Sequence, residues 1–263
     1  MPDVVLGRDV VINRGEHVAV RSSDFTIPSN SITAIIGPNG SGKSTLLDAI
    51  AGLLPIASGT LQVLGTTPEI SQRDVSYVLQ HTDIPAGTPL TVREAVMMGR
   101  YSSLGLFRRP SRKDQERVSG AMARLNISDL SHRHLHELSG GQRQRVYVAQ
   151  GIAQDHSMLL LDEPLTGLDL VSAKTIDSII HDEPERGCSV VLTTHDLEEA
   201  RAADHVILMS GRVVASGPPA EVLTHGNLTE AYGLGALHDA DDESVKYAAD
   251  HEHGHDHGHS HGH

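Results

Sequence analysis

A glycine-rich segment near the N-terminus restricts the fold of this chain more than any other feature. Gly37-Pro38-Asn39-Gly40-Ser41-Gly42-Lys43-Ser44 matches the pattern G-x-x-x-x-G-K-[ST]; it follows an apolar run at 31–36 and leads into a helical pattern at 43–52. Glycines between a buried strand and a helix let the backbone surround a phosphate, and the helix start adds the positive end of its dipole. The segment predicts an α/β fold with a phosphate-binding loop, the alternative being a turn that binds nothing.

The predicted loop supplies the groups that hold a triphosphate and its magnesium ion. Lys43 should reach the β- and γ-phosphates, and the Ser44 hydroxyl should bind Mg²⁺. The nucleotide-binding residues expected from this segment are Gly37, Pro38, Asn39, Gly40, Ser41, Gly42, Lys43, Ser44 and Thr45.

A second apolar run, at 158–161, ends in two adjacent carboxylates, Asp162 and Glu163. Since successive side chains of a strand point in opposite directions, the two carboxylates can serve different purposes. We expect Asp162 to hold the magnesium shell and Glu163 to face an attacking water. A helix-capping pair after a core strand is the alternative.

The remaining patterns alternate between strands and helices. Strand or turn patterns occupy 4–12, 17–20, 24–28, 59–79, 158–161, 189–194 and 205–209. Ser210-Gly211 reads as a hairpin turn after the last of these. Residues 91–153 are mostly helical, and capping boxes are expected at Thr91/Glu94, Ser111/Asp114 and Ser139/Gln142. Strands separated by helices favour a mostly parallel sheet, with the middle helices, about 88–153, as an inserted subdomain.

Several further segments occur in the order and spacing of one known family. Leu138-Ser139-Gly140-Gly141-Gln142 resembles the signature motif of the ATP-binding cassette (ABC) family, and Thr166-Gly167-Leu168-Asp169 resembles its D-loop. Gln80 is similar to the Q-loop glutamine and His195 to the switch histidine. The resemblance covers about residues 4–235. It implies a P-loop NTPase (RecA-like) core with an antiparallel β subdomain and an inserted α-helical subdomain, and a nucleotide-binding domain over 1–235.

The resemblance implies ATP hydrolysis between two copies of the chain. Ser139, Gly140, Gly141, Gln142 and Asp169 would close over ATP bound to a second copy, in a head-to-tail dimer. Glu163 would orient or deprotonate the water, and His195 would contact the γ-phosphate. Gln80 would sense both the water and the Mg²⁺ ion. Ser44 and Asp162 would also hold the Mg²⁺ ion.

One position departs from the family pattern. The family usually has an aromatic residue 25–30 positions before the lysine, where it stacks on adenine; this chain has Asn13-Arg14-Gly15 there. The planar guanidinium of Arg14 could stack on the base instead. An exposed turn arginine is the alternative, and Phe25 reads as a strand core residue.

The segment between Gln80 and Ser139 is where a membrane partner docks in transport members of the family. Here it is similar to importer cassettes for zinc and manganese, which implies a membrane permease and, indirectly, an extracytoplasmic metal-binding protein. A docking groove is expected from Met97, Met98, Tyr101, Leu106 and Phe107, unless they pack inside the helical subdomain. Haem or an iron chelate as cargo, a non-transport ABC ATPase and a metal buffer with a vestigial ATPase are the alternatives.

The composition of the chain restricts its cellular compartment and its partners. The longest apolar runs are too short to span a bilayer, and the N-terminus lacks the pattern of a secretory signal. A single cysteine, Cys188, suits a reducing compartment. The formal charge of −13 argues against a nucleic-acid partner. We expect a cytoplasmic protein held at the inner face of the membrane by its permease.

The C-terminal segment, 236–263, is expected to be a flexible, acidic tail separate from the domain. It contains seven Asp or Glu, one Lys and eight of the 18 histidines. Alternating histidines on a flexible chain can wrap a borderline-soft cation such as Zn²⁺. The candidate ligands are His251, His253, His255, His257, His259, His261 and His263. A merely disordered acidic tail or an expression tag is the alternative.

Overall fold

The computed structural model describes residues 3–79, 88–104 and 109–233 of the 263-residue chain. Gln80, Leu106, Phe107 and the whole histidine-rich tail therefore lie outside the described residues. Among the described helices, none combines the length and the apolar composition that crossing a membrane requires.

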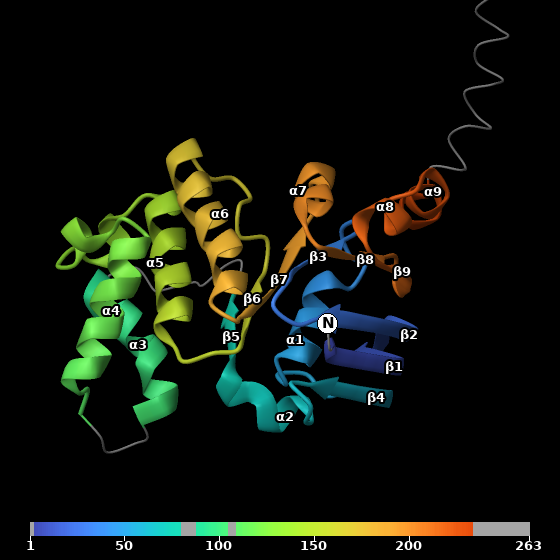
Figure 1. The fold of residues 1–263 in the computed structure, drawn as a ribbon, viewed down its shortest axis with the longest axis horizontal. Coiled ribbons are helices and arrows are strands. Elements are labelled where there is room, and N and C mark those ends of the chain that lie inside the picture. The colour runs from blue at the N-terminus through green and yellow to red at the C-terminus, as the bar shows by residue number, and fades with distance from the viewer. Residues whose placement is uncertain (1–2, 80–87, 105–108, 234–263) are drawn as a thin grey trace, which may run out of the picture.

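A six-stranded sheet runs through the centre of the molecule (Figure 1). Its strands, in spatial order, are β5 (Val75–Val78), β6 (Met158–Leu161), β7 (Ser189–Thr194), β3 (Ile32–Ile36), β8 (His205–Met209) and β9 (Val213–Gly217). The first five are parallel, and β9 returns antiparallel to β8 through the predicted turn at Gly211. Every residue of β3, β6, β7 and β8 is buried, as expected for strands covered on both faces. The predicted parallel sheet is confirmed.

A smaller antiparallel sheet packs beside the central one. It contains β2 (His17–Pro28), β1 (Asp3–Arg14) and β4 (Ser58–Val63). Where the sequence predicted separate strands at 17–20 and 24–28, the structure has the single strand β2. The polar residues between these two segments continue the strand because their hydroxyl and backbone amide groups are hydrogen-bonded. Ser23 Oγ accepts from Val213 N at 2.9 Å, and Arg21 N donates to a carbonyl of the β8–β9 turn at 2.9 Å.

Helices cover both faces of the central sheet (Figure 1). One layer holds α3 (Val92–Leu104), α4 (Arg112–Arg124), α5 (Gly140–Ala153) and α6 (Leu170–Glu185), and α1 (Lys43–Ile50) lies between the two sheets. Shorter helices are α2 (Pro68–Ser71), α7 (Leu197–Ala202), α8 (Pro219–Val222) and α9 (His225–Tyr232), and 3₁₀ segments occupy Gln72–Asp74, Ser128–Leu130 and Leu135–Glu137. Helix α2 stands where the sequence predicted only strands and turns; its first residue, Pro68, has the fixed φ of a helix start.

The three predicted capping boxes are present. Ser111 and Ser139 each accept a hydrogen bond from the amide three residues on, at the starts of α4 and α5. At α3, Thr91 N donates to the Glu94 carboxylate at 2.8 Å and Glu94 N donates to Thr91 Oγ1 at 3.3 Å. These bonds satisfy amides that have no partner within the helix, so the local sequence determines where each helix begins.

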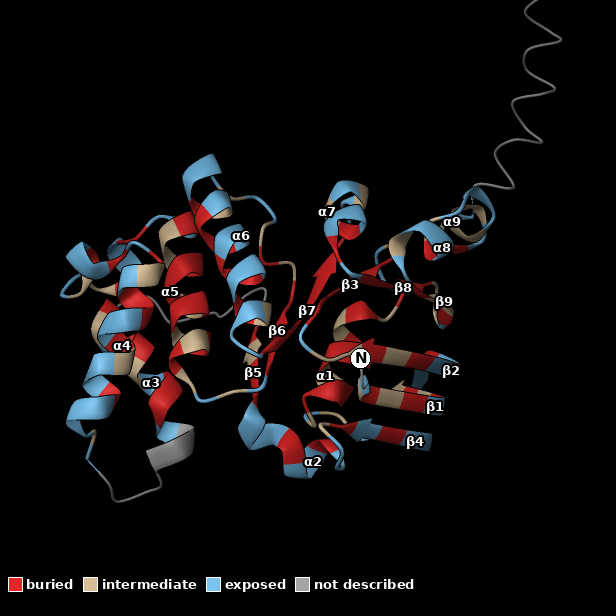
Figure 2. Ribbon diagram, viewed as in Figure 1, coloured by how far each residue is buried: buried red, intermediate tan, exposed pale blue. Residues whose placement is uncertain are grey.

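Alternate residues of the central strands contribute to two separate hydrophobic cores. In β6, Leu159 and Leu161 face the core shared with α3–α6, whereas Met158 and Leu160 face the core shared with α1 and the antiparallel sheet. The period of two of a strand produces this division. Figure 2 shows the strands of the central sheet as largely buried, and buried stretches of α1 and α5 beside them.

Candidate nucleotide site

The predicted phosphate loop connects β3 to α1 and has the backbone geometry of an anion cradle. Gly40 and Gly42 have φ angles of 78° and 99°, which L side chains rarely adopt. A Cβ atom at Gly37 would lie 2.2 Å from the Met209 carbonyl oxygen. The nine expected residues, 37–45, form this loop and the first turn of α1, so the helix start faces the concave side.

The side chain of Lys43 folds back onto the backbone of the phosphate loop. Its Nζ donates to the carbonyls of Gly37, at 2.8 Å, and Pro38, at 3.3 Å, and the residue is only 7% exposed. Burial lowers the pKa of Lys43, while the nearby carboxylates of Glu163 and Asp162 oppose that shift. The lysine therefore lies within electrostatic reach of both predicted carboxylates.

The outer side of the loop rests on the β8–β9 turn and on β2. Gly211 N donates to the Ser41 carbonyl at 3.0 Å, and Ser41 N donates to the Pro38 carbonyl at 3.1 Å. A Cβ atom at Gly42 would lie 2.9 Å from the Ala19 carbonyl oxygen of β2. The shape of the loop is thus fixed by backbone contacts with both sheets.

Asp162 and Glu163 follow the end of β6, so the strand alternation expected from the sequence does not extend to them. Strand β6 already ends at Leu161, and Glu163 has a φ of 45°, in the left-handed region. For a non-glycine residue this conformation costs about 1–3 kcal/mol and recurs at functional sites. The two carboxylates have different partners, since Asp162 Oδ1 accepts from Thr193 Oγ1 and Glu163 Oε2 accepts from Thr166 Oγ1 at 3.3 Å.

Thr193 at the end of β7 holds both carboxylate residues, and sequence analysis missed it. Its Oγ1 donates to Asp162 Oδ1 at 2.5 Å and accepts from Glu163 N at 2.8 Å. A signal was available, since β6 and β7 are parallel neighbours whose polar ends meet at one edge of the sheet.

His195 lies beside Glu163, one residue beyond β7. Its Nδ1 is 3.9 Å from Glu163 Oε2, and its side chain is 58% exposed. The following residue, Asp196, caps α7 by accepting from Glu198 N at 2.7 Å. The structure thus brings Lys43, Asp162, Glu163 and His195 to one edge of the central sheet.

The signature residues form a second glycine-bearing helix start. Ser139 caps α5 together with Gln142. A Cβ atom at Gly140 would have nothing within 4 Å among the described residues, whereas one at Gly141 would lie 2.3 Å from Asp169 Oδ2. Asp169 caps α6, accepting from Ser172 N at 2.9 Å. The five residues expected to act on a second copy are therefore gathered at the adjoining starts of α5 and α6.

Arg14 lies at the end of β1 and contacts α1. Its Nη2 is 3.3 Å from Asp48 Oδ2, and its side chain is 64% exposed. Asp48 also accepts a hydrogen bond from the Tyr77 hydroxyl at 3.2 Å. Arg14 thus stands beside the helix of the phosphate loop, with its guanidinium paired to a carboxylate. Phe25, as predicted, is a buried strand residue.

Comparison with known proteins identifies the same family over much of the chain. The model of the family described as ABC transporter matches residues 20–166. The zinc transport system ATP-binding protein TroB of Treponema pallidum is 39% identical over 80% of this chain and 79% of its own. The manganese transport system ATP-binding protein MntB of Bacillus subtilis is 35% identical over 79% of this chain and 83% of its own.

A solved structure matches the fold over most of its length. It is described as an ABC transporter of the metal-chelate type in an inward-facing conformation, is 28% identical, and covers 88% of this chain and 89% of its own, with a TM-score of 0.77. The predicted P-loop NTPase core, with its antiparallel β subdomain and helical layer, is confirmed.

Proposed function

The chain belongs to the ABC transporter family and is an ATPase of that family, and from this premise we propose that it powers the import of zinc or manganese ions. The relatives named for zinc and for manganese transport carry this assignment of cargo. The metal-chelate type of the matching solved structure supports a chelated metal, such as an iron chelate or haem, as the alternative.

ABC ATPases of importers bind ATP with Mg²⁺ and work as dimers beneath a membrane permease. We propose that Gly37–Thr45 binds the phosphates of ATP and that Ser44, Asp162 and Gln80 hold the magnesium ion. The buried Lys43 and the carboxylate of Asp162, which interacts with it, support this division.

Hydrolysis follows from the groups at the sheet edge. Glu163 orients or deprotonates a water that attacks the γ-phosphorus. The bond between the γ-phosphorus and the oxygen that bridges it to the β-phosphate breaks, which gives ADP and phosphate. His195, 3.9 Å from Glu163, contacts the γ-phosphate, and Lys43 stabilises the charge that spreads over the phosphate oxygens. Thr193 positions the two carboxylate residues.

The exposed start of α5 supports the shared site. Ser139 caps the helix, and the open backbone at Gly140 leaves room for a partner's triphosphate. We propose that two copies pair head to tail, so that Ser139, Gly140, Gly141, Gln142 and Asp169 of one copy complete the site of the other.

Helix α3 supports a permease contact. Met97 packs against the core, which fits the alternative that it is a packing residue of the helical subdomain. Met98 and Tyr101, by contrast, are 47% and 54% exposed. We propose that Met98 and Tyr101 contribute to the surface that receives the permease. The subunit would then be held at the cytoplasmic face of the membrane, with an extracytoplasmic protein delivering the metal.

We propose that 1–235 is the nucleotide-binding domain and that 236–263 is a metal-binding tail. The alternating histidines from His251 to His263 support Zn²⁺ as the ligand. Isothermal titration should count fewer Zn²⁺ sites in a chain ending at Leu237 than in the full chain. Equal numbers of sites would refute the tail proposal.

Uptake measurements test the proposed cargo. Cells lacking this chain should lose uptake of radioactive zinc or manganese, and wild-type protein should restore it. The Glu163→Gln variant should be expressed but should not restore uptake. Loss of chelated iron or haem uptake alone would favour the alternative, and unchanged uptake of every metal would refute a transport role.

A further inference from the structure

Three side chains of metal-binding type meet in the interior, away from the nucleotide site. They are His156, Glu183 and Cys188, whose candidate ligand atoms all lie within 4.8 Å of one another. No other group of three or more such side chains occurs among the described residues. His156 precedes β6 and Cys188 precedes β7, so the cluster lies at the amino ends of the strands whose carboxyl ends carry Asp162 and Thr193. The separation is roughly 20 Å along β6.

The end of α6 brings two of the three side chains together. Gly187, with a φ of 83°, reverses the chain after the helix. As a result Cys188 N donates to the Glu183 carbonyl at 3.1 Å, which places the thiol next to the carboxylate of the preceding turn. A turn with a positive φ in this position is a common way to end a helix.

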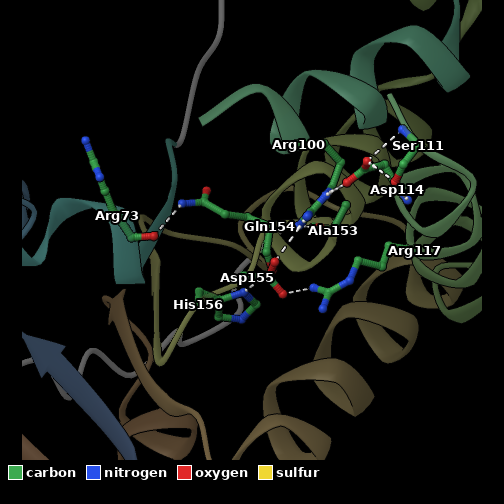
Figure 3. A network of polar contacts seen from close by, with 9 residues as sticks. All are labelled: Arg73, Arg100, Ser111, Asp114, Arg117, Ala153, Gln154, Asp155 and His156. Carbon is green, nitrogen blue, oxygen red and sulfur yellow. Dashed lines mark hydrogen bonds and ion pairs between the residues drawn. The ribbon is translucent and has the colours of Figure 1, made fainter. Parts of the chain in front are cut away.

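The hydrogen bonds of His156 determine which ring nitrogen faces the cluster. Its Nδ1 is 2.9 Å from the Gln154 carbonyl oxygen (Figure 3), which can only accept, so Nδ1 carries a proton. Its Nε2 lies 3.4 Å from Glu183 Oε2, is buried, and has no hydrogen bond of good geometry within the described part of the chain. A neutral His156 would thus turn a lone pair towards a carboxylate, so either a proton or a metal ion on Nε2 has to lie between the two groups.

Arg124 orients the carboxylate but does not fill that position. Its Nη1 donates to Glu183 Oε1 at 2.6 Å, which leaves Oε2 for the cluster. An imidazole whose other nitrogen donates to a backbone carbonyl, beside a carboxylate held by a second group, is the usual surrounding of a metal-binding histidine. The side chains of His156 and Glu183 are each only 5% exposed, so these groups are withdrawn from water.

We propose that His156 Nε2, Cys188 Sγ and Glu183 Oε2 form a binding site for one zinc ion. Tetrahedral zinc holds neighbouring ligand atoms about 3.5 Å apart, so the three atoms need to move by about 1 Å at most. A water molecule would complete the four ligands. Thiolate and imidazole favour zinc over manganese, magnesium or calcium, which prefer oxygen ligands.

Binding of zinc at this site is coupled to the protonation of its ligands. Burial opposes a charge on His156, but contacts with Cys188 and Glu183 outweigh it and raise the pKa of the imidazole to about 10. Zinc, with two positive charges, takes the place of the protons that an imidazole and a thiol give up when they bind a metal. The ion would tie the end of α6 to the starts of β6 and β7, whatever the transporter carries.

Titration with Co²⁺ tests the proposal on the full chain. Co²⁺ occupies tetrahedral zinc sites and gives a near-ultraviolet charge-transfer band when a thiolate binds it. Cys188 is the only cysteine, so the tail histidines cannot produce this band. The wild-type chain should show the band, and Zn²⁺ should abolish it by displacing Co²⁺. No band in folded, ATP-binding wild-type protein would overturn the proposal.

Variants test the other two ligands. His156→Gln and Glu183→Gln should each weaken Co²⁺ binding at this site by at least about tenfold. His181→Gln, at an exposed position of α6, is the matched control and should leave the band unchanged. A band that keeps its intensity and affinity in His156→Gln would also refute the site. Because the wild-type spectrum decides by itself, a variant that fails to fold leaves the proposal open to refutation.

Discussion

Helices α1 and α5 both begin beside glycines, yet their first turns differ in how far they are enclosed. The start of α1 is closed, with Lys43 bonded to the carbonyls of Gly37 and Pro38 and largely withdrawn from water. The start of α5 is open, with nothing described near a Cβ of Gly140. The residues that we propose to bind ATP within the chain are thus enclosed, and those that we propose to act on a second copy are presented outwards.

The surroundings of the open site fit a protein partner. Leu170 and Val171, at the start of α6, are 70% and 66% exposed although both are large and apolar. They lie next to Asp169, which contacts Gly141. Exposed apolar residues beside the proposed signature site are what a second copy would cover.

The largest expected effect on ATP hydrolysis is that of Glu163→Gln. This variant should hold the start of α1 of one copy and the start of α5 of another around the same ATP. Loss of the base should lower ATP hydrolysis by at least about a hundredfold while ATP binding persists. The unhydrolysed ATP should trap a dimer. Phosphate release and size-exclusion chromatography with ATP measure both effects. Wild-type hydrolysis in this variant would remove Glu163 from the proposed mechanism.

The next effect concerns the closed site alone. Lys43→Ala removes charge-assisted hydrogen bonds to the phosphates and should weaken ATP binding by about 10- to 100-fold. Equilibrium binding of a fluorescent ATP analogue measures the change. Circular dichroism checks that α1 still forms. Unchanged affinity would mean that the closed loop is not the primary phosphate site.

A smaller loss is expected at the open site. Gly140→Asp places a negative charge where the partner's triphosphate should bind, so hydrolysis should fall by about tenfold or more while binding to the isolated subunit persists. Gly120→Asp in α4 is the matched control, because its Cβ would likewise have nothing within 4 Å among the described residues. Equal hydrolysis in both variants would contradict the shared site.

The smallest effect concerns the base. If Arg14 stacks on adenine, Arg14→Ala should weaken ATP binding by only about two- to fivefold, the usual magnitude for an exposed cation–π contact. Competition between ATP and GTP measures the preference for the base. If affinity and preference stay the same, Arg14 serves only its ion pair with Asp48.

Local features of the molecule could be predicted from the sequence, and features that depend on distant residues could not. The central strands, the capping boxes and the helix after the phosphate loop follow from apolar runs and nearby hydrogen bonds. The continuity of β2 depends on Ser23 bonding to β9, and the backbone position of Glu163 depends on its hydrogen bond to Thr193. The Arg14–Asp48 pair and the His156–Glu183–Cys188 cluster likewise join segments whose proximity only the fold creates.

The contacts beneath the phosphate loop have a thermodynamic consequence. Ser41 is held by Gly211, and Gly37 and Gly42 are packed against the carbonyls of Met209 and Ala19. A receptor that is already rigid loses little conformational entropy when its ligand arrives, and more of the interaction energy is then available as affinity. The antiparallel sheet and the β8–β9 turn therefore act as preorganising supports, and loosening either should weaken nucleotide affinity without removing any group that touches the nucleotide.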